Sequence, residues 1–140
     1  MKVTEHIKGA QGKTLFSFEI IPPQKGQNIQ KLYDNIDPLM EFKPPFIAVT
    51  GTVGMCASLM NKYQIDTVPH VLCGGFTREE TEYVLVDCHY LGIDNVMALR
   101  GDAMKDEAVF QPQIEGNQYA SDLVRQISDL NQGKYLHEII

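Results

Sequence analysis

The chain has 140 residues, 44% of them apolar, which is enough for one domain with a hydrophobic core across residues 1–140. Its 18 acidic and 12 basic residues give a net charge of −6, whereas a nucleic-acid-binding protein needs a basic surface. No apolar run approaches the roughly 20 residues that cross a bilayer, and residues 1–13 lack the apolar stretch of a secretory signal. These features predict a cytoplasmic protein that binds neither nucleic acid nor membrane.

The first half of the chain contains two apolar runs, each followed by a segment with helical periodicity. The first predicted strand, residues 15–21, stops at Pro22-Pro23 because proline cannot donate a hydrogen bond to a sheet. An apolar stripe over residues 29–40 predicts a helix, which Pro38 can either kink or restart. A second strand at residues 46–50 and a helix at residues 55–63 complete this half.

The second half repeats the pattern. A third strand is predicted at residues 67–72, and Thr77 with Glu80 then forms the clearest helix start in the chain. A fourth strand, residues 95–99, leads through a polar loop at residues 103–117 to the last helix. Strands that alternate with helices imply a parallel sheet. The length favours an open doubly wound sheet, while a (βα)8 barrel would need about 250 residues.

Two cysteines and two histidines are the residues that could bind a metal. His70 and Cys73 have the spacing of two ligands, with Cys88 and His89 as conceivable partners. The paired motifs that supply the four ligands of a structural zinc site are absent, so we predict no metal site. Without paired spacing for disulfides either, we expect Cys56, Cys73 and Cys88 to be reduced and buried.

Ligands of parallel α/β folds meet the carboxyl ends of the strands, so polar residues there are the candidates for chemistry. Glu19 lies near the end of an apolar strand. It could be an ordinary carboxylate, solvated or paired with a lysine, but apolar surroundings would raise its pKa and make it a general acid.

The other strand ends are less specific. His70 alone is more typical of a hydrogen-bonded core residue than of a ligand contact. Arg100-Gly101-Asp102 could close a loop as an ion pair, or let a flat ligand approach the glycine backbone. Tyr119 opens the last helix, where free amides can receive an anion or a ring edge.

Several motifs together point to one family. In order, they are Phe16-Ser17-Phe18-Glu19 with Pro22-Pro23, residues 46–50, Pro69-His70, residues 98–102 and Tyr119-Ala120-Ser121-Asp122. In this order they resemble bacterial methylenetetrahydrofolate reductases over about residues 15–130. The resemblance implies that the four βα units are the first half of a (βα)8 TIM barrel.

The resemblance also implies an activity. Members of the family are oxidoreductases that use NAD(P)H and FAD to reduce 5,10-methylenetetrahydrofolate to 5-methyltetrahydrofolate. By the matching motifs, Glu19 resembles the acid that opens the folate ring to an iminium, and Asp102 the carboxylate that faces flavin and pterin. The positions that match residues lining FAD are Thr50, His70, Arg100, Gly101, Asp102, Tyr119 and Ala120.

Two departures from the family lead us to expect a truncated chain or a longer polypeptide with segments missing. Thr50 runs directly into residues 51–54, where the family has a longer loop, and residues 134–140 stop where a fifth strand should follow. Four strands alone would leave two open sheet edges, which favours a homo-oligomer. The alternatives are a non-catalytic half-barrel that binds flavin, nucleotide or a partner chain, and a lyase or aldolase-type barrel that uses Glu19 and Asp102.

Overall fold

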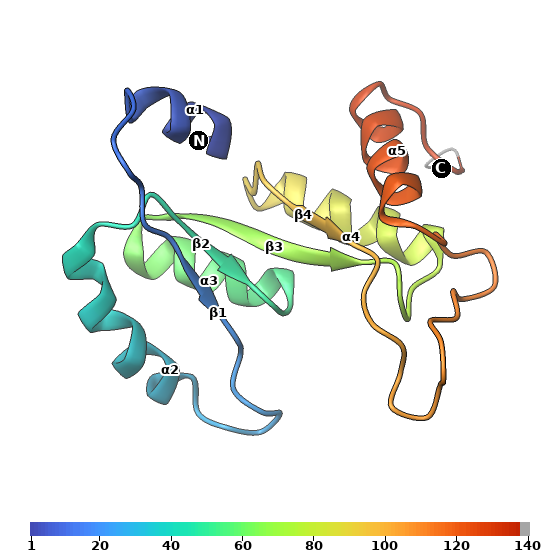
Figure 1. Cartoon of the computed structure of the whole chain (residues 1–140), viewed down its shortest axis with the longest axis horizontal. Helices are drawn as coiled ribbons and strands as arrows, with labels where there is room; N and C mark the ends of the chain where they lie inside the picture. The colour runs from blue at the N-terminus through green and yellow to red at the C-terminus, as the bar shows by residue number, and fades with distance from the viewer. Residues whose placement is uncertain (138–140) are drawn as a thin grey trace. The chain divides into compact units, whose positions relative to one another are not determined.

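The computed structural model describes residues 1–137 as parallel strands that alternate with helices (Figure 1). The strands form one sheet in the order β1 (Phe18–Ile20), β2 (Phe46–Val49), β3 (Asp66–Leu72) and β4 (Met97–Leu99). A doubly wound sheet reverses its strand order at a switch point, whereas a (βα)8 barrel adds each strand beside the previous one. The unbroken order therefore confirms the prediction of the first four units of a barrel.

The helices begin and end largely where their sequence signals predict. Thr77 Oγ1 accepts from the Glu80 amide at 3.2 Å, and Glu80 Oε2 accepts from the Thr77 amide at 2.8 Å, which confirms the predicted start of α4. Pro38 restarts the preceding helix rather than kinking it, because α2 ends at Ile36 and a 3-10 helix follows. The helices are α2 (Ile29–Ile36), η1 (Asp37–Phe42), α3 (Val53–Tyr63), α4 (Arg78–Tyr90) and α5 (Ala120–Asn131).

Two predicted strands were too long. β1 covers three residues instead of residues 15–21, and Phe16 and Ile21 on either side of it are 70% and 75% exposed. β4 begins at Met97 rather than at residue 95. The Asn95 side chain instead bonds the N-terminal segment, where its Oδ1 accepts from the Val3 amide at 2.8 Å.

The chain divides into two compact units, and β3 contributes to both. Unit 1 comprises Met1–Pro69 with Ile93–Asn95, and unit 2 comprises His70–Gly92 with Val96–Ile140. The core of unit 1 includes the fully buried side chains of Ile36, Ile47, Val49, Cys56 and Leu59. The core of unit 2 is built on Val71, Cys73 and Leu123. As predicted, all three cysteines are buried thiols.

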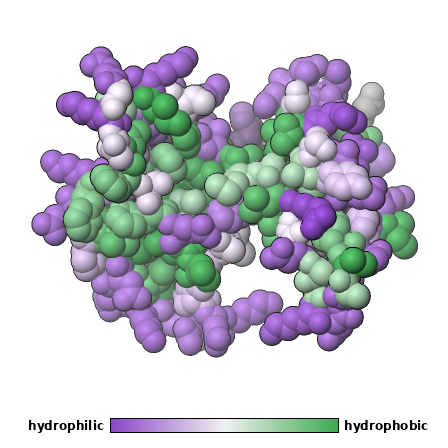
Figure 2. Space-filling model, in the orientation of Figure 1, coloured by the Kyte–Doolittle hydropathy of each residue, from purple (hydrophilic) through white to green (hydrophobic). Residues whose placement is uncertain are grey.

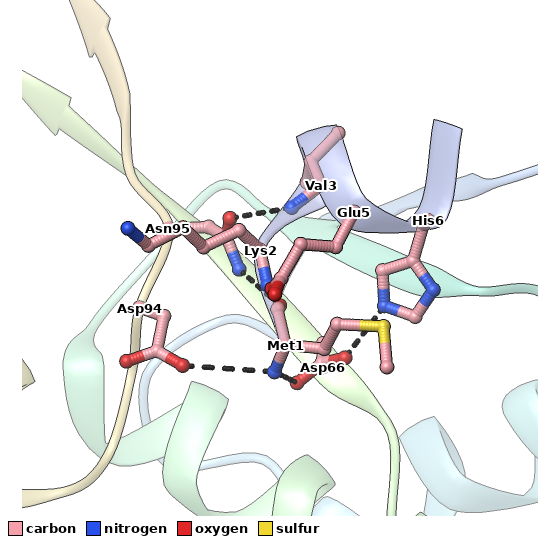
Figure 3. Close-up of polar contacts among 8 residues, drawn as sticks. All are labelled: Met1, Lys2, Val3, Glu5, His6, Asp66, Asp94 and Asn95. Atoms are coloured by element: carbon pink, nitrogen blue, oxygen red, sulfur yellow. Dashed lines mark hydrogen bonds and ion pairs between the residues drawn. The ribbon is translucent and has the colours of Figure 1, made fainter. Parts of the chain in front are cut away.

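An additional helix, α1 (Val3–Gly9), lies at the amino end of the strands of unit 1 (Figure 3). The Met1 amino group lies 2.7 Å from Asp66 Oδ1 and 3.6 Å from Asp94 Oδ2. His6 Nε2 contacts the other oxygen of Asp66 at 2.7 Å, and Asn95 Nδ2 donates to the Met1 carbonyl at 3.0 Å. We call Met1, His6, Asp66, Asp94 and Asn95 the amino-end cluster.

The amino-end cluster shifts the titration of two of its members. The hydrogen bond to Asp66 raises the pKa of the Met1 amino group above its ordinary value. Burial alone would raise the pKa of Asp66, but hydrogen bonds from the Met1 amine and His6 outweigh it and hold that pKa below its ordinary value. Each folded-state shift favours the charged form, so the pair stabilises the folded chain while both groups are ionised.

Within residues 1–137, we find no helix with the length and apolar character needed to span a bilayer.

Candidate functional site

Two polar side chains meet at the carboxyl end of β1 and β2 in unit 1. Thr50 follows the last residue of β2, and its amide donates to the Ile20 carbonyl at 3.0 Å, which extends the parallel pairing by one residue. The Thr50 hydroxyl donates to Glu19 Oε1 at 2.9 Å. This bond holds one carboxylate oxygen of Glu19, whose residue is exposed.

Glu19 is exposed, which corrects the prediction that apolar neighbours surround it. β1 is the first strand of the sheet and pairs with β2, so Glu19 has its register partner Ala48 on one side. Phe16 and Ile21, which were expected to bury it, are themselves largely exposed. The alternation of β1 turns Ile20 into the core and Glu19 to the opposite face.

The loop after β2 packs closely on the loop after β1. A Cβ atom on Gly51 would lie 2.4 Å from Cγ of Pro22, a separation that real Cβ contacts do not reach. The proline ring cannot rotate away as a flexible side chain would, because its ring is closed onto the backbone. Gly51 therefore allows the chain beside Thr50 to approach the end of β1.

In unit 2, hydrogen bonds continue past the ends of β3 and β4. The Cys73 amide donates to the Leu99 carbonyl at 2.9 Å, and the Gly74 amide donates to the Arg100 carbonyl at 3.1 Å. Gly101 then takes a left-handed backbone conformation, with φ of +85°, which a residue with a Cβ rarely adopts. The turn leaves Arg100 and Asp102 exposed on either side of a bare backbone segment.

Phe110 orients Arg100, although the sequence pattern does not predict this contact. The Arg100 guanidinium carbon lies 5.1 Å from the centre of the Phe110 ring, a cation–π distance. A Cβ atom on Gly74 would come within 3.1 Å of the same ring, so the ring packs directly on the loop after β3. The one sequence feature that could have identified Phe110 is an aromatic residue within a polar stretch that otherwise predicts a solvated loop.

The start of α5 carries Tyr119 and Ala120. The Tyr119 amide is occupied, because Asp122 Oδ2 accepts from it at 2.9 Å. A carboxylate already in this position repels a second anion, so the helix start suits a ring edge better than a phosphate. The sequence predicted an anion or a ring edge at this helix start, and the structure favours the ring edge.

Two further residues of unit 2 are less accessible. His70 lies on β3 opposite Met97 of β4 and is partly buried. Burial raises the pKa of the Cys73 thiol, the negative charge of Asp122 adds to the shift, and Arg100 opposes it. Among residues 1–137, no three His, Cys, Asp or Glu side chains come together as metal ligands would.

The predicted site residues thus fall into two groups. Unit 1 contains Glu19 and Thr50, joined by one hydrogen bond. Unit 2 contains the remaining predicted residues, which are His70, Arg100, Gly101, Asp102, Tyr119 and Ala120.

Comparison with known proteins identifies the family. A sequence model of the methylenetetrahydrofolate reductase family matches residues 2–138. The chain belongs to this family. The methylenetetrahydrofolate reductase motifs identified in the sequence lie within the matched region, so the match confirms the resemblance.

Three relatives of the reductase family show how much of a full-length protein is present. Methylenetetrahydrofolate reductase 2 of Saccharomyces cerevisiae is 30% identical over 141 residues, which cover 91% of this chain and 24% of the yeast protein. Methylenetetrahydrofolate reductase (NADH) 1 of Arabidopsis thaliana is 32% identical over 139 residues, covering 91% and 23%. The 5,10-methylenetetrahydrofolate reductase of Escherichia coli is 28% identical over 137 residues, covering 91% and 44%. The chain therefore spans less than half the length of each relative.

Proposed function

We propose that this chain supplies the proton-donating and flavin-holding residues of a 5,10-methylenetetrahydrofolate reductase, with NAD(P)H as the reductant and 5-methyltetrahydrofolate as the product. The observation that carries the proposal is the family match over residues 2–138. It is supported by the placement of Glu19 within β1 and of Arg100-Gly101-Asp102 directly after β4, where parallel α/β enzymes bind their substrates.

The residues of unit 2 fit FAD by their chemistry. Arg100 offers an exposed cation, and Gly101 offers a backbone without a side chain. Tyr119 and Ala120 lie at a helix start whose partial positive charge is already balanced by the Asp122 carboxylate. Such a set suits a flat ring system with an anionic portion. Thr50, in unit 1, matches a flavin-lining position of the family by its motif. When bound, FAD would accept hydride from the nicotinamide and transfer it to the folate.

Glu19 would act as the general acid. Its proton would go to the folate nitrogen that leaves the one-carbon bridge as the five-membered ring opens, and the C–N bond electrons would remain on that nitrogen. The Thr50 hydroxyl, bonded to Oε1, would hold the carboxyl group in one orientation during the transfer. Substrate stacked over this exposed carboxyl group would exclude bulk water from the proton transfer.

Asp102 would act through its charge. Ring opening leaves a positive charge on the bridge carbon and its remaining nitrogen, and a nearby carboxylate stabilises such a cation. Asp102 is exposed in the turn after Gly101, so its carboxylate is available to a ligand. Replacing it with asparagine should slow folate reduction more than flavin reduction.

The test separates the two half-reactions of the purified chain loaded with FAD. We expect NADH or NADPH to bleach the visible flavin bands of the wild type and of Glu19→Gln at similar rates. Reoxidation by methylenetetrahydrofolate should fall at least about 100-fold in Glu19→Gln, the usual size of a general-acid contribution. Glu41→Gln, a substitution at an exposed residue of η1, is the matched control.

Three results would count against this function. A wild-type chain that shows no flavin bands after incubation with FAD would overturn it. Equal reoxidation rates in the wild type and Glu19→Gln would remove Glu19 from the mechanism. Turnover of a substrate without any flavin would instead favour a lyase or aldolase activity that uses Glu19 and Asp102.

A second candidate function is that of a half-barrel which binds another copy of the chain without catalysis. Apolar side chains gather on the surface of unit 1 around β1 and β2 (Figure 2), where Phe16, Ile21 and Phe42 are 70%, 75% and 65% exposed. Exposed apolar clusters of this kind favour association. We expect light scattering to show a homo-oligomer that dissociates in Ile21→Asp, and a monomeric wild type would argue against it.

A further inference from the structure

The loop between β4 and α5 is held at its far end by two buried primary amides. Asn117 ends the loop and Gln126 lies on α5, and each side chain is only 3% exposed. We propose that Asn117 and Gln126 are positioning residues that fix the first turn of α5, and with it Tyr119 and Ala120. Their meaning for catalysis rests on the function proposed above, but their effect on α5 does not.

The two amides form a relay with one possible orientation. Gln126 Nε2 donates to the main-chain carbonyl of Arg78, the first residue of α4, at 2.7 Å. Asn117 Nδ2 donates to Gln126 Oε1 at 2.7 Å. Because a carbonyl can only accept, the nitrogen of Gln126 must face Arg78, and its oxygen must then face Asn117. The relay therefore links the end of the loop, the body of α5 and the start of α4.

The loop backbone is also bonded directly to the start of α4. The Arg78 amide donates to the Glu115 carbonyl at 2.9 Å, so Arg78 bonds the loop directly as well as through Gln126. A Cβ atom on Gly116 would lie 2.8 Å from the Phe76 carbonyl oxygen, which shows how closely the loop approaches the segment before α4. Residues 115–117 are thereby fixed against the start of α4.

A fixed loop end is needed because the rest of the loop is open. Residues 103–117 contain no helix or strand, and Met104, Val109 and Ile114 are 67%, 65% and 88% exposed. A loop of this length would leave the helix that follows it poorly placed. One residue separates Asn117 from Tyr119, so this end of the relay lies within one helical turn of the proposed flavin-lining positions.

Hydrogen exchange of the chain without flavin tests the positioning role. In Gln126→Met, which removes both bonds and keeps the side-chain length, the amides of Asp122 and Leu123, which donate to the Tyr119 carbonyl, should exchange about ten-fold faster. Amides of Val71 and Ala98, which lie in the paired strands β3 and β4, should change much less. Gln132→Met is the matched control, since Gln132 is exposed and its side chain makes a longer contact of 3.5 Å to Ser128.

A double-mutant cycle tests whether the two amides act as one unit. Asn117→Leu should speed exchange at Asp122 and Leu123 as Gln126→Met does, and the double variant should be no faster than the more affected single variant. Should Gln126→Met fail to fold, Asn117→Ala removes the amide donor without adding a charge and gives the same readout. Equal acceleration of residues 122–123 and of residues 127–131 would overturn the proposal, because it would show that the amides stabilise the helix as a whole.

A flavin measurement then connects the relay to the proposed function. In the chain loaded with FAD, Gln126→Met should weaken FAD binding about ten-fold and change the visible circular dichroism of the bound flavin, whereas Gln132→Met should do neither. Unchanged binding and spectrum in Gln126→Met would disconnect the relay from the flavin. A wild type that binds no FAD would refute the proposed function, and the exchange result would still decide the role of the relay.

Discussion

The two ends of the strands in unit 1 differ in how their polar groups are held. At the amino end, Asp66 accepts from the Met1 amino group and from His6, each at 2.7 Å, and only 24% of its side chain is exposed. At the carboxyl end, Glu19 and Thr50 share one bond and are both exposed. The amino end ties together distant parts of the chain, while the carboxyl end leaves its polar groups accessible.

The two ends of unit 1 therefore serve different purposes, one for stability and the other, by our proposal, for chemistry. Ion pairs that join the N-terminal helix to β3 stabilise the fold but leave few groups for a ligand. A single exposed bond contributes little to stability, and its carboxylate remains available to react. Parallel barrels separate the two in the same way, with stability at the amino ends of the strands and catalysis at the carboxyl ends. Three substitutions test this division.

The largest effect is expected from Gly51→Ala at the carboxyl end. The added Cβ would meet Pro22 Cγ at 2.4 Å, and relieving this overlap should cost about 2 kcal/mol of unfolding free energy. Gly54→Ala is the matched control, because its Cβ would find the nearest atom at 3.9 Å and alanine favours the helix α3. Urea denaturation of both variants measures the difference, and equal stabilities would show that the two loops are not packed as described.

An intermediate effect is expected from Asp66→Asn at the amino end. Asparagine lacks the negative charge that Asp66 presents to the Met1 amine and His6. We expect the unfolding free energy to fall by only about 1 kcal/mol, because 58% of the Met1 side chain is exposed and solvent screens the pair. Asp94→Asn should have a smaller effect, since Asp94 is 55% exposed and 3.6 Å from the amine. FAD binding and folate reduction should be unchanged in both, and a loss of either would contradict the separation of the two ends.

The stability difference between wild type and Asp66→Asn should depend on pH with a definite sign. The Met1 amine has a raised pKa, so its contribution is complete below its ordinary value of 8.0 and is lost as the pH rises through the folded value. Asp66 has a lowered pKa, so its contribution is present above its ordinary value of 3.8 and is lost as the pH falls through the folded value. Denaturation at a series of pH values should show a constant stability difference between these two ordinary pKa values and a smaller difference outside them. A stability difference that does not change outside this pH range would exclude the ion pair.

Features that depend on neighbouring residues were predicted well from the sequence. The capping residues Thr77 and Glu80, the helix interruption at Pro38 and the polar turn after β4 each follow from chemistry within a few positions. The exposure of Glu19 was not predicted, because it depends on β1 lying at the end of the strand order. An apolar run in the sequence does not reveal whether its strand has a neighbour on each side.

Features that depend on contacts between distant residues were missed. No residue of α1 is buried, so the helix has no apolar stripe, and it is held by Asp66 and Asn95, far along the chain. Asn117 and Gln126 resemble solvated polar residues in the sequence, although both are buried in the fold. The polar residues at the strand ends could therefore be predicted from the sequence, but the contacts between distant residues around them could not.

The smallest effect on stability is expected from Thr50→Val, which removes the hydroxyl that holds Glu19 and keeps the backbone bond from Thr50 to Ile20. Because the lost bond is exposed, unfolding free energy should change by about 0.5 kcal/mol or less. Reoxidation of the reduced flavin by methylenetetrahydrofolate should nevertheless slow several-fold, since the Glu19 carboxyl group would no longer be held in one orientation. Thr4→Val, at an exposed position of α1, is the control and should leave this rate unchanged. Thr50→Val thus reverses the pattern expected for Asp66→Asn, which lowers stability and spares the reaction. If Thr50→Val instead lowers stability as much as Asp66→Asn and leaves reoxidation unchanged, the carboxyl end is a structural contact and Glu19 needs another partner to act as an acid.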